Sequence, residues 1–333
     1  MRVTVLGAGY MGSAMAEVAA MRGHDVRLWG TWLDDALVEA VEQGRDHPRL
    51  KKKLDARVKP MRSGALAEAL DGAELVIHGV SSDGLVPVLT KAAPHLPDVP
   101  ILSVTKGFLP TKSGKMDRVD VIASEIVGRP LRYVHAAGPA KAIEIARRVL
   151  TWMFFASADV ADARACSAAV GGNHLRVTVS DDIAGAEICS AMKNAYATGL
   201  GLWDGLVGAD CHNARAACFQ QAVVEMAKLV AAGGGRVETA YAAPGVGDLH
   251  VTAAAGRNRA FGERVGKGKP AKTVAAEMLA TGELTEGYPA IASAWRWAKE
   301  RGVTDLPLLA ALHAIVWEGA EVAPTLAKLE LSL

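Results

Sequence analysis

The stretch Val3-Thr-Val-Leu-Gly7-Ala-Gly9-Tyr-Met-Gly12 decides the fold of the first part of this 333-residue chain. Its apolar run ends in a Gly-x-Gly-x-x-Gly pattern, and a helix-prone run, residues 13–21, follows. The order strand, tight turn, helix is the context in which this glycine pattern predicts a dinucleotide site. Gly7 is expected to permit the turn, Gly9 to admit a pyrophosphate and Gly12 to let helix and strand pack closely. The helix N-terminus would offer its N–H groups and positive dipole end to the phosphates.

The rest of the chain divides into two parts by its pattern. Residues 1–180 alternate short β-rich runs with helix-length segments, which predicts a Rossmann-like, doubly wound, mainly parallel sheet. Residues 181–333 are rich in Ala, Leu and Glu and are expected to form an all-α domain that binds the substrate. The later strands are expected at 25–29, 75–80, 101–105, 132–135 and 152–155, and helices of the second part at 187–202, 214–232, 273–280, 290–301 and 306–317.

Composition excludes several classes of protein. A formal net charge of +1 argues against a nucleic-acid partner, which needs a basic face. No apolar run reaches the roughly 18 residues that a membrane helix needs. The chain starts directly with a strand, which leaves no room for a signal peptide and favours a cytoplasmic protein. Cys211 lies beside His212, with Cys218 further on, but this spacing fits no common zinc site, so no metal is expected.

Two further loops are expected at the carboxyl edge of the sheet, where open parallel sheets bind ligands. Residues 79–84 are small and polar, which suits a close passage along a cofactor. Lys106 follows another predicted strand end, at the mouth of the expected dinucleotide site. A lysine there is a candidate ligand of the cofactor.

The second part of the chain contains the residues that could perform chemistry. Lys193-Asn194 lies in a helix whose other residues are mostly small, which suits packing beside a cleft. Residues 245–249 contain Asp248 in a glycine-rich turn. In the loop 256–259, two arginines flank an asparagine and could form a phosphate clamp, since Arg binds phosphate through paired, charge-assisted hydrogen bonds.

Taken together, these motifs resemble the soluble NAD(P)-dependent glycerol-3-phosphate dehydrogenases. The segments 29–31, 44–50 and 79–84 are similar to a branch of that family with archaeal members. The resemblance runs nearly end to end, over the ordered motifs at residues 7–12, 106–107, 138–144, 180–183, 191–194, 204–205, 213–215, 247–249, 257–262 and 286–287.

The resemblance implies reversible hydride transfer between a nicotinamide and C2 of glycerol 3-phosphate. Lys193 matches the family's proton acceptor, with Lys106 and Asp248 also in catalytic positions. The implied cofactor-binding residues are Gly7, Gly9, Tyr10, Met11, Gly12, Thr31, Ser81, Lys106, Ala142, Arg257 and Glu286. The implied substrate-binding residues are Lys106, Gly138, Lys193, Asn194, Asp248, Thr252, Arg257 and Asn258.

The physical chemistry of lysine fits the implied role of Lys193. A free lysine has a pKa of about 10.4, too high for an efficient base near neutrality. Desolvation and a second cation such as Lys106 would lower it. Asp248 would act in the opposite direction if it paired with Lys193, so its expected contribution is orientation. In the reductive direction the ammonium would give a proton to the developing alkoxide.

The sequence departs from the family pattern at two places. Ala140 stands where the family usually has a residue with a hydroxyl or amide side chain. Its neighbour Lys141 is expected on the surface. Gly256 stands where a Ser often precedes the Arg-Asn pair. Both departures bear on substrate affinity and identity.

The position that selects between NAD and NADP holds Trp29-Gly30-Thr31, with neither a carboxylate to bind ribose hydroxyls nor an Arg to attract a 2′-phosphate. Asp34 and Asp35 are interpreted as first-turn residues of a helix capped by Thr31. Binding of both cofactors is expected, with a slight preference for NADP.

Two alternatives remain open from the sequence. One is a two-domain dehydrogenase for another phosphorylated alcohol or a hydroxy acid. The other is a dinucleotide sensor without turnover, against which the presence of both Lys193 and Lys106 argues. The resemblance also suggests a homodimer, with a small molecule as substrate.

Overall fold

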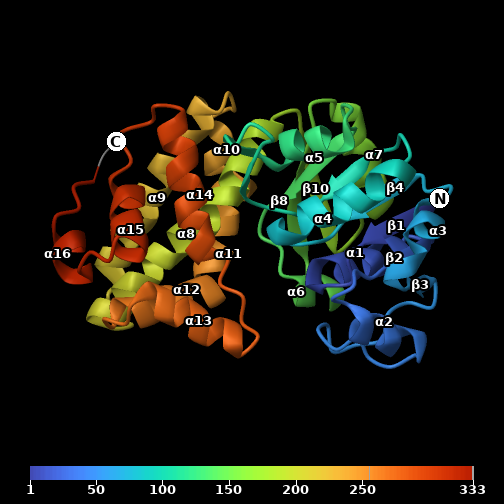
Figure 1. Ribbon diagram of the computed structural model, residues 1–333, viewed down its shortest axis with the longest axis horizontal. Coiled ribbons are helices and arrows are strands. Elements are labelled where there is room, and N and C mark those ends of the chain that lie inside the picture. The colour runs from blue at the N-terminus through green and yellow to red at the C-terminus, as the bar shows by residue number, and fades with distance from the viewer. Residues whose placement is uncertain (255, 332–333) are drawn as a thin grey trace. The chain divides into compact units, whose positions relative to one another are not determined.

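The computed structural model describes residues 1–254 and 256–331, which group into two compact units. Unit 1 comprises residues 1–106 and 119–183, and unit 2 comprises residues 107–118 and 184–333. The predicted α/β fold followed by a helical part is confirmed (Figure 1). The predicted division at residue 180 leaves the segment 107–118 in the first part, whereas its contacts group it with unit 2.

The described part of unit 1 is built on an eight-stranded sheet with the order β10-β9-β8-β5-β4-β1-β2-β3. Its strands are β1 (Arg2–Leu6), β2 (Asp25–Trp29), β3 (Val58–Met61), β4 (Leu75–His78), β5 (Ile101–Ser103), β8 (Tyr133–Ala137), β9 (Thr151–Ala156) and β10 (Leu175–Ser180). Its helices are α1 (Tyr10–Met21), α2 (Asp35–Glu42), α3 (Leu66–Leu70), α4 (Ser82–Ala92), α5 (Val119–Val127), α6 (Ala142–Ala146) and α7 (Val160–Val170), with 3₁₀ turns at Ser63–Ala65 and Ala93–His95.

Both faces of this sheet are buried, because helices cover each of them. On one side α1 contacts α6 and α7, and on the other α4 contacts α3 and α5. Neighbouring strand residues point to opposite faces, so Val5 packs in the core under α1, whereas Leu6 packs in the core under α3 and α4. Burial on both faces explains why these strands read as apolar runs.

One strand pair runs against the predicted parallel direction. β8 and β9 pair in antiparallel fashion, while the other neighbouring pairs of the sheet are parallel. A parallel connection needs a crossover that returns the chain to the starting edge of the sheet. The five-residue helix α6 is too short for that return, so β9 begins at the edge where β8 ends.

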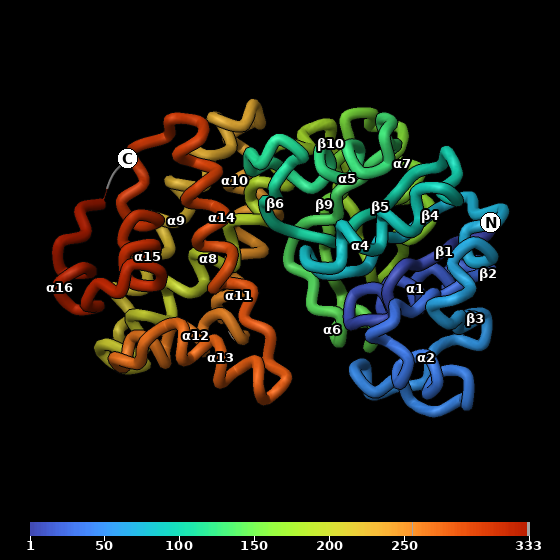
Figure 2. The backbone as a smooth tube through the Cα atoms, viewed as in Figure 1, coloured from blue at the N-terminus to red at the C-terminus, as the bar shows by residue number. Residues whose placement is uncertain are grey.

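The described part of unit 2 consists of helices and one β-hairpin, formed by β6 (Phe108–Pro110) and β7 (Met116–Arg118). The hairpin packs against α14 (Figure 2), where Phe108 stacks on Trp297 at 4.8 Å and the N–H of Met116 donates to Glu300. The helices are α8 (Ile183–Val207), α9 (His212–Ala232), α10 (Glu238–Tyr241), α11 (Asp248–Ala254), α12 (Arg257–Gly266), α13 (Ala271–Ala280), α14 (Gly287–Glu300), α15 (Pro307–Trp317) and α16 (Val322–Ala327), with a π-helical turn at Ala243–Gly247.

Glycines bring two helices of unit 2 into backbone contact. A Cβ on Gly201 of α8 would lie 2.1 Å from the carbonyl oxygen of Arg259, and one on Gly262 of α12 would lie 2.1 Å from that of Thr198. Gly205 and Gly266 make equally close approaches one turn further along. Only glycine allows this spacing, which holds α12 directly against α8.

Candidate functional site

The glycine turn of unit 1 has the geometry that its sequence predicts. Gly7 adopts φ +102°, and a Cβ there would lie 2.7 Å from Val80. A Cβ on Gly12 would lie 2.0 Å from the carbonyl oxygen of Gly7, so helix and turn require a glycine at that position. A Cβ on Gly9 would meet only Arg49, at 3.2 Å, so the surface above Gly9 can admit a ligand.

The N-terminus of α1 fits an anionic group. Gly9 is the N-cap residue, and no side chain of the described residues caps the helix. The first N–H groups of a helix have no partner within it, so here they are available to a phosphate. Tyr10 is exposed, whereas Met11 is partly buried and packs against the core of unit 1. These residues therefore fit a dinucleotide pyrophosphate.

The loops after β4 and β5 are tied together by a buried histidine that the sequence did not single out. His78 Nδ1 lies 3.1 Å from Thr105 Oγ1, and that hydroxyl donates to the carbonyl oxygen of Val80 at 2.8 Å. Complete burial lowers the pKa of His78 to about 4, so the imidazole is neutral. This network fixes Thr105, the residue before Lys106, and Lys106 itself is partly buried. Ser81 is exposed and is the N-cap residue of α4.

The turn after β2 differs from the sequence-based interpretation. Thr31 does not cap α2; Asp34 is the N-cap residue, and its carboxylate accepts from the Thr31 hydroxyl at 2.8 Å and from the N–H of Ala8 at 3.2 Å. Asp34 and Thr31 are both buried. The Asp34 side chain thus holds the glycine turn by its hydrogen bond to the N–H of Ala8. The sequence could not predict this role, because Ala8 and Asp34 lie far apart in the chain.

The segment after β8 carries two of the predicted site residues. Gly138 adopts φ +100°, which suits a tight turn at the strand end. Ala142 is buried as the first residue of α6. Lys141 is exposed, as expected, and Ala140 is half-buried.

In unit 2, α8 and α11 bring Lys193 and Asp248 together. Lys193 Nζ lies 2.6 Å from Asp248 Oδ1. The lysine side chain is 12% exposed and the aspartate side chain 1% exposed, so this is a nearly dry ion pair. A carboxylate in contact favours the charged form of an ammonium. The structure therefore contains the pairing that the sequence reasoning regarded as unfavourable for a base.

Three helices meet at a network of side-chain amides. Asn258 Nδ2 of α12 donates to Asn194 Oδ1 of α8 at 2.8 Å, and Asn194 Nδ2 donates to Glu286 at 2.9 Å. Asn258 Oδ1 accepts from the N–H of Gly287, the first residue of α14. Asn194 and Asn258 are buried. The network orients both asparagines, whose sequence positions suggested only ligand binding.

The two arginines of the predicted phosphate clamp have different environments. Arg259 Nε donates to buried Asp204 at 2.5 Å, and its Nη1 donates to the carbonyl oxygen of Ala254 at 2.8 Å. Arg257 is exposed and makes no hydrogen bond or ion pair with another described residue. The ion pair with Asp204, which also pairs with Arg215, makes Arg259 less available to a phosphate than Arg257, and the two-arginine clamp stays a prediction. Thr252, on α11, is partly exposed.

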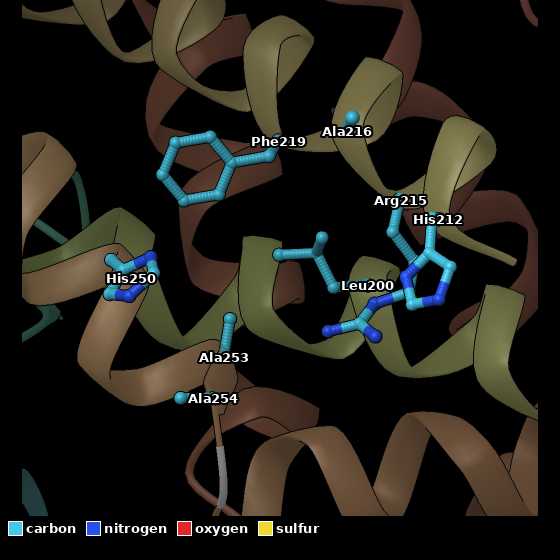
Figure 3. A pocket seen from close by; sticks show the side chains of 8 residues that line it. All are labelled: Leu200, His212, Arg215, Ala216, Phe219, His250, Ala253 and Ala254. Atoms are coloured by element: carbon cyan, nitrogen blue, oxygen red, sulfur yellow. The ribbon is translucent and has the colours of Figure 1, made fainter. Parts of the chain in front are cut away.

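A pocket of about 250 Å³ opens elsewhere in unit 2, between α8, α9 and α11 (Figure 3). Figure 3 shows Arg215 and His212 on one side of it and His250 on another. It is lined by Leu200, His212, Arg215, Ala216, Phe219, His250, Ala253 and Ala254, none of which is a predicted site residue.

All four cysteines are buried. Burial raises the pKa of Cys166 and of Cys218 to about 12. Within residues 1–254 and 256–331, His, Cys, Asp and Glu side chains form no group of three that could hold a metal ion. No helix in the same part of the chain is long and apolar enough to cross a membrane.

A glycine turn on a mainly parallel sheet, followed by a helical unit with a buried lysine–aspartate pair, is the arrangement expected of a two-domain dehydrogenase that binds a dinucleotide. Two family models match the chain: the NAD-dependent glycerol-3-phosphate dehydrogenase N-terminus over residues 2–163 and the C-terminus over residues 182–327. The chain belongs to this family. This result confirms the resemblance seen in the sequence.

Individual relatives agree with the family match. An NADP(+)-dependent glycerol-3-phosphate dehydrogenase of Archaeoglobus fulgidus is 33% identical over 333 residues, covering 99% of each chain. A glycerol-3-phosphate dehydrogenase [NAD(P)+] of Thiobacillus denitrificans is 35% identical, covering 96% of this chain and 94% of the relative. The crystal structure of glycerol-3-phosphate dehydrogenase from Coxiella burnetii has a TM-score of 0.84 and 28% identity, covering 98% of both chains.

Proposed function

We propose that the chain catalyses the reversible NAD(P)-dependent oxidation of sn-glycerol 3-phosphate to dihydroxyacetone phosphate. Its family membership and the names of its relatives support this reaction. The observation that carries the proposal is the 2.6 Å ion pair between Lys193 and buried Asp248. In the same unit, Arg257 is exposed and its guanidinium has no hydrogen bond or ion pair with another described residue. Residues 1–180 would supply most of the cofactor site, and residues 181–333 most of the substrate site.

Lys193 is the proton donor and acceptor in this proposal. The nicotinamide, when bound, supplies or accepts the hydride. In the reductive direction, the Lys193 ammonium gives its proton to the oxygen at C2 and stabilises the negative charge that develops there. Asp248 fixes the direction of the Lys193 ammonium through their 2.6 Å contact, which suits delivery of a proton in the reductive direction. In the oxidative direction, the amine must first lose its proton and then accept that of the hydroxyl.

The substrate phosphate is assigned to Arg257, because its guanidinium is available, and to the neighbouring Asn258. Thr252 also belongs to the proposed substrate site. Asn194 and Asn258 complete the substrate site, held in place by their mutual hydrogen bond. Lys106 and Gly138 from unit 1 also belong to the proposed substrate site. The proposed cofactor site comprises Gly7, Gly9, Tyr10, Met11, Gly12, Thr31, Ser81, Lys106, Ala142, Arg257 and Glu286.

Both cofactors are proposed to bind, with NADP preferred. The relative from Archaeoglobus fulgidus, named as NADP(+)-dependent, supports this preference. We also propose a homodimer in the cytoplasm, which sedimentation analysis and cell fractionation would test.

A substrate panel tests the proposed reaction. Oxidation of NADPH would be followed with dihydroxyacetone phosphate, with unphosphorylated dihydroxyacetone and with a 2-keto acid. The proposal expects kcat/KM to be highest for dihydroxyacetone phosphate. Equal or better turnover of the keto acid would show that the chain is a hydroxy-acid dehydrogenase.

A further inference from the structure

The 250 Å³ pocket of unit 2 has a set of side chains of its own (Figure 3). From α9 it is lined by His212, Arg215, Ala216 and Phe219. These positions follow one another at intervals of three, one and three residues, which places them on one face of the helix. His250 of α11 lines another side. None of these residues belongs to the proposed substrate site, so the pocket has a separate chemistry.

The charges beside this pocket do not balance. Arg215 Nε lies 3.4 Å from Oδ1 of Asp204, and the other oxygen of the same carboxylate accepts from Arg259 Nε at 2.5 Å. No other carboxylate in the described part of the chain forms an ion pair with either arginine. Two guanidinium groups therefore share one buried carboxylate, which leaves an excess of one positive charge.

Arg215 is the less committed of the two arginines. Arg259 also donates through Nη1 to the carbonyl oxygen of Ala254 at 2.8 Å. Arg215 Nε is buried, yet it makes no hydrogen bond with another described residue. The Arg215 side chain as a whole is 23% exposed, so a ligand in the pocket can contact its other N–H groups. A guanidinium that is partly desolvated and incompletely paired favours an added acceptor.

Two imidazole rings add further donors. His212 and His250 are exposed, and neither ring makes a hydrogen bond with another residue of the ranges 1–254 and 256–331. Either tautomer of a neutral imidazole carries one N–H group. With Arg215, these rings can donate to an anionic group from two sides of the pocket (Figure 3).

The remaining lining is apolar. Phe219 meets the ring of His250 edge-on, with the ring centres 6.3 Å apart. Leu200 of α8 also lines the pocket and belongs to the core of unit 2. Ligand pockets typically combine such apolar walls with a few polar groups that fix the orientation of the ligand. The lining therefore suits a ligand with one anionic end and one apolar end.

We propose that this pocket binds a small monocarboxylate with a compact apolar body. The planar guanidinium of Arg215 matches the two oxygens of a carboxylate, and Phe219 and Leu200 would contact the apolar body. One negative charge balances the single excess positive charge beside Asp204, whereas a phosphate monoester carries nearly two. The inference goes beyond the proposed reaction and does not depend on it.

Binding of benzoate tests this inference, because benzoate carries one carboxylate on one ring. Ligand-observed NMR would measure its Kd, which should be about 1 mM for a ligand of this size in an open pocket. Benzyl alcohol keeps the ring without the charge, and acetate keeps the charge without the ring. Each should bind at least about ten-fold more weakly than benzoate. Dihydroxyacetone phosphate should not displace benzoate, since its proposed ligands lie outside the pocket.

Two variants separate the charge of the pocket from its space. Arg215→Gln removes the guanidinium and should raise the Kd of benzoate by about ten-fold. Ala216→Leu keeps every charge, fills the pocket from an exposed position of α9 and should abolish detectable binding. Its thermal midpoint should stay near that of the wild type. Arg264→Gln changes a partly exposed arginine of α12 outside the pocket and, as the matched control, should bind benzoate like the wild type.

Several results would overturn the inference. The wild type would then show no saturable binding of benzoate up to about 10 mM, or would bind benzyl alcohol equally well. Unchanged binding in Ala216→Leu would place benzoate elsewhere, and unchanged binding in Arg215→Gln would show that the charge is not recognised. If benzoate does not bind and Ala216→Leu changes the sedimentation coefficient, the pocket is instead a contact between copies of the chain.

Discussion

At the scale of single residues, identical side chains a few positions apart have different tasks. Arg257 and Arg259 look equivalent in the sequence, yet Arg259 is ion-paired with Asp204 while Arg257 is exposed. The sequence predicted Lys193 and Asp248 as site residues but not their contact, because α8 and α11 are joined by tertiary packing. His78 and Asp34 gave no local signal, since their partners lie far away along the chain.

Substitution of Arg257 tests the phosphate assignment. Arg257→Ala removes one charge-assisted contact and should raise KM for dihydroxyacetone phosphate by about 10²-fold, with a smaller change in kcat. Arg264→Ala, at a partly exposed position of the same helix, is the control and should leave KM unaltered. An unaltered KM in Arg257→Ala would remove this residue from the phosphate site.

Gly9 and Gly12 differ in what a methyl group would disturb. Gly9→Ala meets only the tip of Arg49, so the thermal midpoint should stay close to that of the wild type. The same methyl group occupies the surface above Gly9, so the Kd of NADPH should rise by about ten-fold or more. Gly12→Ala should lower the midpoint itself, because its Cβ collides with Gly7. If NADPH binding survives in Gly9→Ala, the phosphates lie elsewhere.

At the scale of elements, the long periodic segments were predictable and the short ones were not. The strand at 25–29 and the helix at 214–232 were placed within a few residues of β2 and α9. β3 was missed because it is four residues long and contains a lysine and a proline. The hairpin 107–118 was missed because tertiary contacts with α14 stabilise it, and such contacts leave no local pattern.

Even a small side chain in place of a glycine at the contact between α8 and α12 should destabilise the protein. Gly262→Ala places a Cβ 2.1 Å from the carbonyl oxygen of Thr198, which forces the helices apart. The expected loss in free energy of unfolding is about 1–3 kcal/mol. Because Asn258 lies on the displaced helix, KM should also rise. Urea unfolding and steady-state kinetics would measure both, with Arg264→Ala as the control on the solvent side of α12. Unchanged stability would mean that the two backbones can separate at no cost.

At the scale of the whole molecule, buried histidines couple stability to pH. His78 has a pKa of about 4 in the folded state, below its value of about 6.5 in an unfolded chain. The unfolded state therefore binds more protons between these values, and stability falls as the pH is lowered from about 6.5 to 4. Burial lowers the pKa of His47 as well, with the same sign.

Replacement of His78 isolates its share of this pH dependence. In His78→Gln, the free energy of unfolding should fall less steeply between pH 6.5 and 4, by up to about 1.4 kcal/mol per pH unit. Urea unfolding at several pH values would measure the slope, and other titrating groups cancel in the comparison with the wild type. Identical slopes would show that His78 is protonated as easily in the folded protein as in the unfolded chain.

The central claim is that Lys193, held by Asp248, transfers the proton when dihydroxyacetone phosphate is reduced. Its most direct test is the rate of NADPH oxidation on addition of this substrate, compared between the wild type and Lys193→Ala, with the Kd of NADPH measured on both. The account predicts rapid oxidation by the wild type, a rate lower by at least about 10²-fold in Lys193→Ala, and similar NADPH binding. A wild-type protein that binds NADPH but does not oxidise it, or a variant that retains most of its kcat, would contradict the account.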